Sequence, residues 1–172
     1  MIREANILWQ YIDEESHLIM PWYVLPCLEW LKKQDIREWR VFEYGCGYST
    51  IWWRNNCRHL KSIDHSEYWA VAMGCYPEKE KTKFIESSTI ESPEFYKRFL
   101  WDCIIVDGKW REECVEFCLR YIDQGGYLII DNWGQEDFPN TQKYLELLKD
   151  WKSIIFEQPN HSTWKTAIFQ KP

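Results

Sequence analysis

Short apolar runs alternate with amphipathic segments along most of the chain. The runs end at polar residues, and the segments after them space their apolar positions as a helix does. Runs that are apolar almost without a break indicate strands buried on both faces, as in a parallel sheet. The pattern predicts strands near 41–43, 61–64, 83–86, 103–106 and 127–130, and helices near 25–32, 50–56, 67–73, 93–99, 111–122 and 141–149.

The last two expected strands, 152–157 and 163–170, break this alternation. Only residues 158–162 separate them, which is too short a connection for a crossover between parallel strands. We therefore expect an antiparallel hairpin at the end of a mostly parallel sheet. In the helix before it, the spacing directs four residues toward the core: Tyr144, Leu145, Leu147 and Leu148.

The main functional signal follows the first expected strand. The residues Glu43-Tyr44-Gly45-Cys46-Gly47 lead directly into a helix, and glycines in such a turn let a ligand reach the backbone. Nineteen residues beyond Gly45, Asp64 ends the second strand, at the offset where nucleoside-binding folds place an acid for ribose hydroxyls. The simpler alternative is that Glu43 and Asp64 cap the helices that follow them.

Together, the acidic-x-Gly-x-Gly turn, the acid after the second strand and the terminal hairpin resemble class I S-adenosylmethionine-dependent methyltransferases. The resemblance covers residues 39–172, and the stretch 43–53 is similar to small methyltransferase-like proteins without an assigned substrate. It implies a Rossmann-like three-layer α/β sandwich with a mostly parallel seven-stranded sheet and an antiparallel terminal hairpin. We expect a single domain, 1–172, with a helical cover at 1–38 that lies partly over the site and a Rossmann-like core at 39–172.

The resemblance implies S-adenosyl-L-methionine as the cofactor and assigns its site position by position. Glu43 would hold the cationic methionine end, and Asp64 would accept from the ribose. The cofactor's carboxylate would use amide groups at the helix start near Ser49. The cofactor-binding residues expected on this basis are Glu43, Gly45, Gly47, Ser49, Asp64, His65 beside the adenosine, Ser87 or Ser88 near the adenine, and Asp107.

Thr50 argues against a nicotinamide cofactor. A dinucleotide-binding turn needs a third small residue, so that helix and strand pack closely beside a pyrophosphate, and Thr50 occupies that place. The acid at Glu43 would also repel a pyrophosphate. S-adenosylmethionine carries no phosphate, so the same turn suits it better.

Polar residues after the fourth and fifth strands are candidates for the chemistry. Asp107 ends one strand and Asp131-Asn132 end the next, and neighbouring parallel strands bring such ends together. These three residues resemble the divalent-metal ligands of catechol-type O-methyltransferases. Those enzymes place a lysine three residues beyond the first ligand, whereas Lys109 follows Asp107 by two. We therefore favour structural or cofactor-bonding roles for the two acids, without a metal.

Methyl transfer to a hydroxyl needs a group that removes its proton. The expected catalytic residues are Asp107, Lys109 and His161. His161 lies in the turn of the terminal hairpin, and this turn should emerge at the cofactor edge of the sheet. His17, in the N-terminal cover, is a comparable candidate for the proton-accepting group.

The composition of the chain limits the classes of partner and the cellular compartment that we expect. The chain has 172 residues and a net charge of −6, and its 21 Lys and Arg are dispersed, which argues against nucleic acid. No apolar run reaches the length of a membrane span, and the first residues lack the order of a signal peptide. Seven cysteines without a C-x-x-C pair suit a reducing compartment. We expect a cytoplasmic protein without a membrane partner.

The sequence favours methyl transfer from S-adenosylmethionine to a small molecule, with O-methylation as the expected outcome. One alternative is a scaffold protein that binds the cofactor but has lost turnover, since the metal-site lysine is displaced. A second alternative, from a different class, is a nicotinamide-dependent oxidoreductase.

Overall fold

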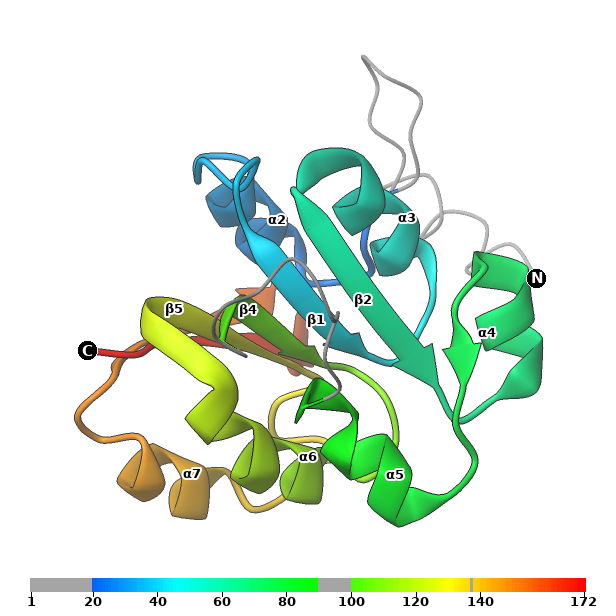
Figure 1. Ribbon diagram of the computed structural model, residues 1–172. Helices are drawn as coiled ribbons and strands as arrows, with labels where there is room; N and C mark the ends of the chain where they lie inside the picture. Colours follow the sequence, from blue (N-terminus) through cyan, green and yellow to red (C-terminus); the bar gives the residue numbers. More distant parts are fainter. Residues whose placement is uncertain (1–19, 90–99, 137) are drawn as a thin grey trace.

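The computed structural model describes residues 20–89, 100–136 and 138–172, and its strands form one seven-stranded sheet (Figure 1). The strand order is β3-β2-β1-β4-β5-β7-β6, and every pairing is parallel except those of β7 with β5 and β6. The strands are β1 (Arg40–Tyr44), β2 (His59–Asp64), β3 (Tyr76–Pro77), β4 (Trp101–Val106), β5 (Ile122–Asp131), β6 (Lys152–Gln158) and β7 (His161–Gln170). This confirms the mostly parallel sheet and the antiparallel terminal hairpin.

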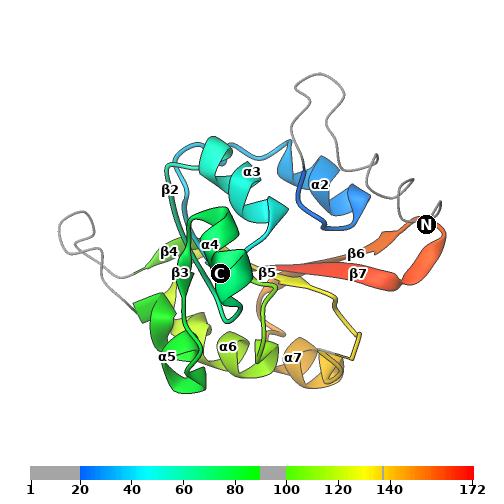
Figure 2. The same cartoon turned by 90° about the vertical axis from the view of Figure 1, so that its right-hand side faces the viewer.

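Helices cover both faces of this sheet. Figure 2 shows α2 and α3 on one face and α5, α6 and α7 on the other, with α4 beside the β3 edge. The helices are α2 (Leu25–Leu31), α3 (Tyr48–Asn56), α4 (Glu67–Met73), α5 (Lys81–Glu86), α6 (Arg111–Cys118) and α7 (Thr141–Leu147), with 3-10 turns at Ser87–Thr89 and Leu119–Tyr121. The expected Rossmann-like three-layer sandwich is therefore confirmed.

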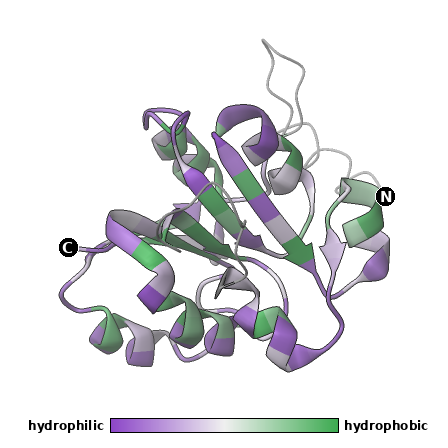
Figure 3. Ribbon diagram, viewed as in Figure 1, coloured by the Kyte–Doolittle hydropathy of each residue, from purple (hydrophilic) through white to green (hydrophobic). Residues whose placement is uncertain are grey.

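The two faces of the central strands pack into two separate apolar cores. In β4, Ile104 and Val106 point to the core under α5, α6 and α7, whereas Cys103 and Ile105 point to the core under α2 and α3. This alternation follows from the two-residue period of a strand. Because each face of β4 packs into one of these two cores, the side chains of both faces are apolar (Figure 3). Within the described residues, no helix has both the length and the apolar character that crossing a bilayer needs.

The strand expected at 83–86 is wrong. These residues belong to helix α5, in which the Phe84 N–H donates to the Glu80 carbonyl at 2.9 Å, and the third strand is the short β3. Only Phe84 and Ile85 are apolar there, and two adjacent apolar residues cannot distinguish a strand period from a helix period. The helix expected at 93–99 lies outside the described residues.

Two smaller expectations also needed correction. The helix expected at 111–122 ends as α6 and a 3-10 turn, because Ile122 already begins β5 and pairs with Trp101. Tyr144 in α7 and Leu148 directly after the helix are buried as expected, and Leu145 is partly buried against the core, but Leu147 is 50% exposed. A seven-residue helix buries only one narrow side, and Leu147 lies outside it.

The strand register brings several loops to one edge of the sheet. Tyr44 pairs with both Ile63 and Val106, and Val106 pairs with Ile130, so β1, β2, β4 and β5 end at the same level. The chain leaves β1 toward β2 on one side and returns to β4 on the other. Ligands bind at such a switch point in open α/β sheets.

Gly45 and Gly108 bring two loops into backbone contact at this switch point. Gly45 has φ +100°, and a Cβ built there would lie 2.7 Å from the Gly108 nitrogen. The Gly45 N–H donates to the Ile63 carbonyl at 2.8 Å, and the Asp107 N–H donates to the Tyr44 carbonyl at 2.9 Å. Backbone atoms therefore close the space between β1 and β4, and a side chain at either glycine would separate the loops.

Replacing Gly45 with Ala should lower the free energy of unfolding by about 2 to 4 kcal/mol, because strained backbone and a backbone clash act together. Gly125→Ala is the matched control, since Gly125 also has positive φ (+74°) but nothing lies within 4 Å of its Cβ position. Its expected loss is about 1 kcal/mol. Urea unfolding measures both values, and equal losses would contradict the loop contact.

Candidate functional site

A cavity of about 290 Å³ opens at the switch point, above the contact between Gly45 and Gly108. Loops that follow β1, β2 and β4 line it, together with side chains from α4 and the start of α6. The lining residues are Gly45, Cys46, Asp64, His65, Trp69, Asp107, Gly108, Lys109 and Arg111. The structure thus brings five of the expected site residues together: Gly45, Asp64, His65, Asp107 and Lys109.

Asp64 fixes the glycine turn against the end of β2. Its Oδ2 accepts the Cys46 N–H at 2.6 Å, and its Oδ1 accepts the Ser66 N–H at 2.7 Å. The Ser66 hydroxyl in turn caps α4. Each carboxylate oxygen has two acceptor sites, so these two hydrogen bonds leave acceptor capacity on both oxygens of a residue that lines the cavity.

His65 offers an unsatisfied polar atom at the same place. Its Nδ1 is buried and lies 3.2 Å from Asp64 Oδ1, but among the described residues no atom forms a hydrogen bond with it. The ring packs near Phe84 and Trp110, with centroid separations of 6.4 and 6.2 Å. Buried polar atoms without partners are rare in proteins, and one beside a cavity is available to a ligand.

Glu43 lies beneath the glycine turn, outside the cavity lining. Hydroxyl groups satisfy its carboxylate: Thr50 donates to Oε2 at 2.7 Å, Ser62 donates to Oε2 at 2.6 Å, and Ser49 donates to Oε1. Burial raises the pKa of Glu43 to about 7 despite these hydrogen bonds. Its carboxylate therefore joins the first turn of α3 to β2, and a role in holding the cofactor stays a prediction.

Arg111 joins the ends of β4 and β5. The guanidinium donates to the carbonyls of Gly108 at 2.9 Å, Asp131 at 2.6 Å and Asp107 at 3.1 Å, and its Nη2 lies 3.1 Å from Asp107 Oδ1. The Thr166 hydroxyl donates to Asp131 Oδ1 at 2.6 Å. Asp107 and Asp131 are thus neighbours, as the strand order predicts.

The two acids share an environment that favours their protonated forms. Burial and the nearby Asp131 carboxylate raise the pKa of Asp107 well above its usual value, and Arg111 opposes this shift. Burial also raises the pKa of Asp131, and the Thr166 hydrogen bond opposes it. In the part of the chain that the structure describes, no three His, Cys, Asp or Glu side chains are grouped to hold a metal ion. Arg111 supplies a positive charge beside these acids.

Ser87 and Ser88 lie far from this cavity, which contradicts their expected place at the end of a third strand. The Ser87 hydroxyl donates to the Lys83 carbonyl at 2.7 Å, and the Ser88 carbonyl accepts from Trp101 Nε1 at 2.9 Å. Trp101 begins β4, so the serines lie at the end of the sheet where the parallel strands start, opposite the cavity. The reason is that α5 runs back across the sheet where a strand was expected.

The remaining expected residues lie around the cavity rather than in its wall. His161 begins β7 at the hairpin turn, is exposed, and stacks on Trp164 with ring centroids 4.8 Å apart. Gly47 faces open space, with no atom within 4 Å of its Cβ position. Helix α2 packs beside β6 and contributes no lining residue to this cavity. The expected cover at 1–38 stays a prediction, because residues 1–19 lie outside the described residues. His17 lies outside the described residues.

The lining residues that sequence reasoning missed are Cys46, Trp69, Gly108 and Arg111. Asp107-Gly108 repeats the acid-and-glycine pattern of the first turn, which was a usable signal for Gly108. The sequence contained no signal for Arg111, because a charged residue in the first turn of a helix is usually solvated. Its burial depends on three carbonyl groups that only the folded backbone brings together.

The sequence matches no protein-family model, and a search of curated proteins found no match. Solved structures do match. An O-methyltransferase from Bacillus cereus in complex with SAH aligns with a TM-score of 0.61 at 17% identity, over 98% of this chain and 90% of that chain. The O-methyltransferase TomG from Streptomyces achromogenes, in complex with SAM, aligns with a TM-score of 0.59 at 16% identity, over 98% and 89%.

An enzyme that methylates nitrogen shares the same architecture. N-methyltransferase NodS from Bradyrhizobium japonicum aligns with a TM-score of 0.54 at 14% identity, over 86% of this chain and 95% of that chain. At these identities the similarities establish the fold. The chain thus has the Rossmann-like fold of class I methyltransferases.

The buried Glu43 should make stability depend on pH. Its pKa is about 7 in the folded protein and near 4.5 in the unfolded chain, so the folded state binds the proton more tightly. The free energy of unfolding should therefore fall as pH rises from about 4.5 to about 7.

Glu43→Gln removes this titration while preserving shape. Relative to the variant, the wild-type protein should lose about 2 to 3 kcal/mol of stability between pH 5 and pH 8, as urea unfolding measures it. Comparison with the variant subtracts the contributions of Asp107 and Asp131. A stability difference that stays constant over this range would contradict the buried, proton-binding state of Glu43.

Proposed function

We propose that the protein is an S-adenosylmethionine-dependent methyltransferase that acts on a small molecule, with a hydroxyl oxygen as the methyl acceptor. The observation that carries the proposal is the cavity at the switch point, where a backbone contact between Gly45 and Gly108 forms the floor and Asp64 stands at the end of β2. The fold shared with enzymes crystallised with SAM and SAH supports the choice of cofactor.

The residues at the cavity fit this cofactor. Asp64 keeps free acceptor positions for two ribose hydroxyls, and the orphaned Nδ1 of His65 lies beside it. Gly47 leaves open the space next to the turn, which a side chain would fill. When bound, the cofactor supplies a methyl group on a positively charged sulfur, which an acceptor oxygen can attack in line.

Asp107 is the favoured base for the acceptor. Its side chain is 29% exposed at the cavity, and burial raises the pKa of its carboxyl group, so its ionised form binds a proton more tightly than an ordinary aspartate does. Arg111 holds it in place through the 3.1 Å contact. Lys109, exposed in the same lining, would orient an acceptor oxygen. His161 lies outside the lining, which supports Asp107 over it.

Calorimetric titration with SAM and SAH tests the proposal. Asp64→Asn keeps the size of the side chain but replaces one acceptor oxygen with a donor, and it should weaken binding by about 1.5 to 3 kcal/mol. The matched control is Asp150→Asn, an exposed acid after α7, which should bind like the wild-type protein. Unchanged affinity in Asp64→Asn would contradict the ribose assignment.

Gly47→Val probes the space above the turn. The protein leaves that space empty, so the variant should keep its melting temperature but lose detectable SAH binding. Normal binding by this variant would place the ligand elsewhere. A wild-type protein that binds neither SAM nor SAH would refute the proposed function, and binding without transfer to any acceptor would favour the scaffold alternative.

A further inference from the structure

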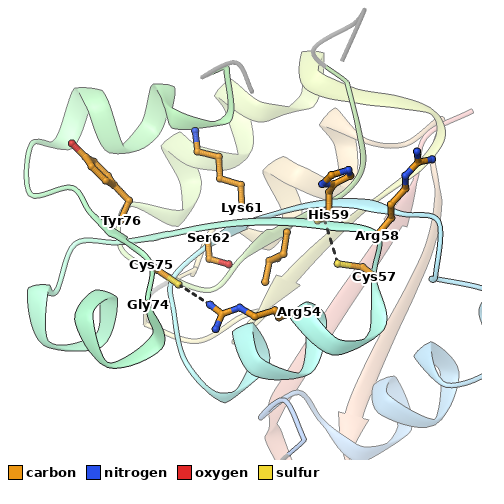
Figure 4. Close-up of a pocket in the computed structure, with 10 residues that line it drawn as sticks. Arg54, Cys57, Arg58, His59, Lys61, Ser62, Gly74, Cys75 and Tyr76 are labelled. Carbon is orange, nitrogen blue, oxygen red and sulfur yellow. Dashed lines mark hydrogen bonds between the residues drawn. The ribbon is translucent and has the colours of Figure 1, made fainter. Parts of the chain in front are cut away.

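Two cysteine side chains from separate loops meet beside the candidate site. Cys46 lies in the glycine turn after β1 and lines the cavity at the switch point, where it is 8% exposed. Cys75 directly precedes β3 and lines a different cavity, of about 340 Å³, beside β2 (Figure 4). The Cys46 thiol donates a hydrogen bond to Cys75 Sγ, and neither cysteine forms a disulfide. The proposed methyl transfer uses neither thiol.

The sheet register brings these two loops together. The last residue of β1 and the first residue of β3 both pair with Ile63 of β2. Two residues beyond β1, the Cys46 N–H donates to Asp64 Oδ2 at 2.6 Å, which holds the glycine turn over the end of β2. Cys75 lies one residue before β3. The two cysteines therefore approach the end of β2 from its two sides.

The contact is close enough for a disulfide to form with little movement. Two sulfur atoms that share a hydrogen bond need to approach to about 2 Å in order to bond. Cys46 lies in a turn, and Cys75 follows Gly74, the left-handed residue that ends α4. Cys75 Sγ also lies 3.5 Å from the Met73 carbonyl, a weak contact that a disulfide would replace. Both cysteines thus lie outside the interior of a helix or strand, where the backbone can adjust.

Cys75 is the more reactive of the two thiols. Arg54 Nη2 lies 3.9 Å from Cys75 Sγ, on the side of β2 where Figure 4 also shows Ser62. The hydrogen bond from Cys46 lowers the pKa of the Cys75 thiol, and the charge of Arg54 acts in the same direction. The Ser62 hydroxyl also lowers this pKa, whereas burial and the Glu43 carboxylate oppose the shift. A thiolate is the form of cysteine that oxidants attack, and Cys75 is partly exposed.

The other five cysteines lack this combination of a thiol partner, exposure and a lowered pKa. Four of them are fully buried: Cys27, Cys103, Cys114 and Cys118. Cys57 is partly exposed, but its thiol donates to the His59 carbonyl at 3.3 Å, and burial raises its pKa to about 12. Cys57 is therefore the natural control for Cys75.

We propose that Cys46 and Cys75 form a modification site, at which a hydroperoxide converts the two thiols into a disulfide. The Cys75 sulfur attacks one oxygen of hydrogen peroxide, the O–O bond breaks, and a sulfenic acid and hydroxide form. The Cys46 sulfur then attacks the sulfenic sulfur, the S–S bond forms, and a second hydroxide leaves. The two thiol protons go to the two hydroxides. Two thiols and one hydrogen peroxide thus give one disulfide and two water molecules.

The disulfide would tie the glycine turn to the start of β3. Cys46 is hydrogen-bonded to Asp64, so drawing its sulfur toward Cys75 shifts the turn beside the proposed ribose acceptor. This consequence rests on the proposed function. SAH should bind about tenfold more weakly to the oxidised protein than to the reduced protein, because one ribose hydrogen bond becomes misaligned. Dithiothreitol should restore the affinity.

Peptide mapping of the full chain tests the site. The protein is treated with hydrogen peroxide, blocked with iodoacetamide, digested with trypsin without reduction and analysed by mass spectrometry. A disulfide should join peptides 41–54 and 62–79, and dithiothreitol should separate them. Cys46→Ala and Cys75→Ala should each abolish this product, whereas the matched control Cys57→Ala should form it as the wild-type protein does.

Alkylation rates give a second test that needs no oxidant. In the reduced protein at neutral pH, iodoacetamide should label Cys75 faster than Cys57, because the thiolate is the reacting form. Cys46→Ala removes the hydrogen bond to Cys75 and should move the midpoint of its pH-dependent labelling upward. Melting temperatures identify any variant that fails to fold, and the wild-type rates do not depend on the variants.

Three results would overturn the proposal. The first is no product joining peptides 41–54 and 62–79, the second is equal formation of disulfides that contain Cys57, and the third is labelling of Cys57 as fast as of Cys75. Equal SAH affinity of the oxidised and reduced protein would contradict the effect on the cavity. A reduced protein that does not bind SAH would refute the proposed function, whereas the peptide map tests the disulfide in either case.

Discussion

The contact between the backbones of Gly45 and Gly108 is the constraint on which the candidate site depends. It joins the loops after β1 and β4, and neither position has room for a side chain between them. Hydrogen bonds from Gly45 to Ile63 and from Asp107 to Tyr44 continue the sheet pairing into these loops. Because the floor of the cavity is backbone, the side chains around it are held at fixed positions, and ligand binding would require little reorganisation.

Around this floor, the fold buries charge where a structural role alone would favour apolar groups. Glu43 is satisfied by three hydroxyls beneath the turn, and the Arg111 guanidinium pairs with the Asp107 carboxylate and donates to the Asp131 backbone carbonyl. Burial raises the pKa values of all three carboxyl groups. Of the three, Asp107 lines the cavity, and a perturbed carboxyl group at a cavity is typical of functional sites.

The sequence predicted those parts of the structure that depend on local pattern. The strands around Phe42, Ile104 and Ile129 were recognisable because both of their faces are apolar, and the turn at Gly45 because only glycine permits its geometry. The strand expected around Phe84 was wrong, because two adjacent apolar residues fit both the strand period and the helix period. Ser87 was therefore expected at the cavity end of the sheet and lies at the opposite end. It also missed Arg111, because the carbonyl groups that bind it come from three segments that only the tertiary structure brings together.

A nucleoside-containing ligand at the switch point, between Asp64 and Asp107, is the feature on which the proposed function depends. A crystal structure of the protein grown with SAH tests this most directly. SAH should lie along the glycine turn, with both ribose hydroxyls within hydrogen-bonding distance of the Asp64 carboxylate. SAH bound at the opposite end of the sheet, near Ser88, would contradict this assignment.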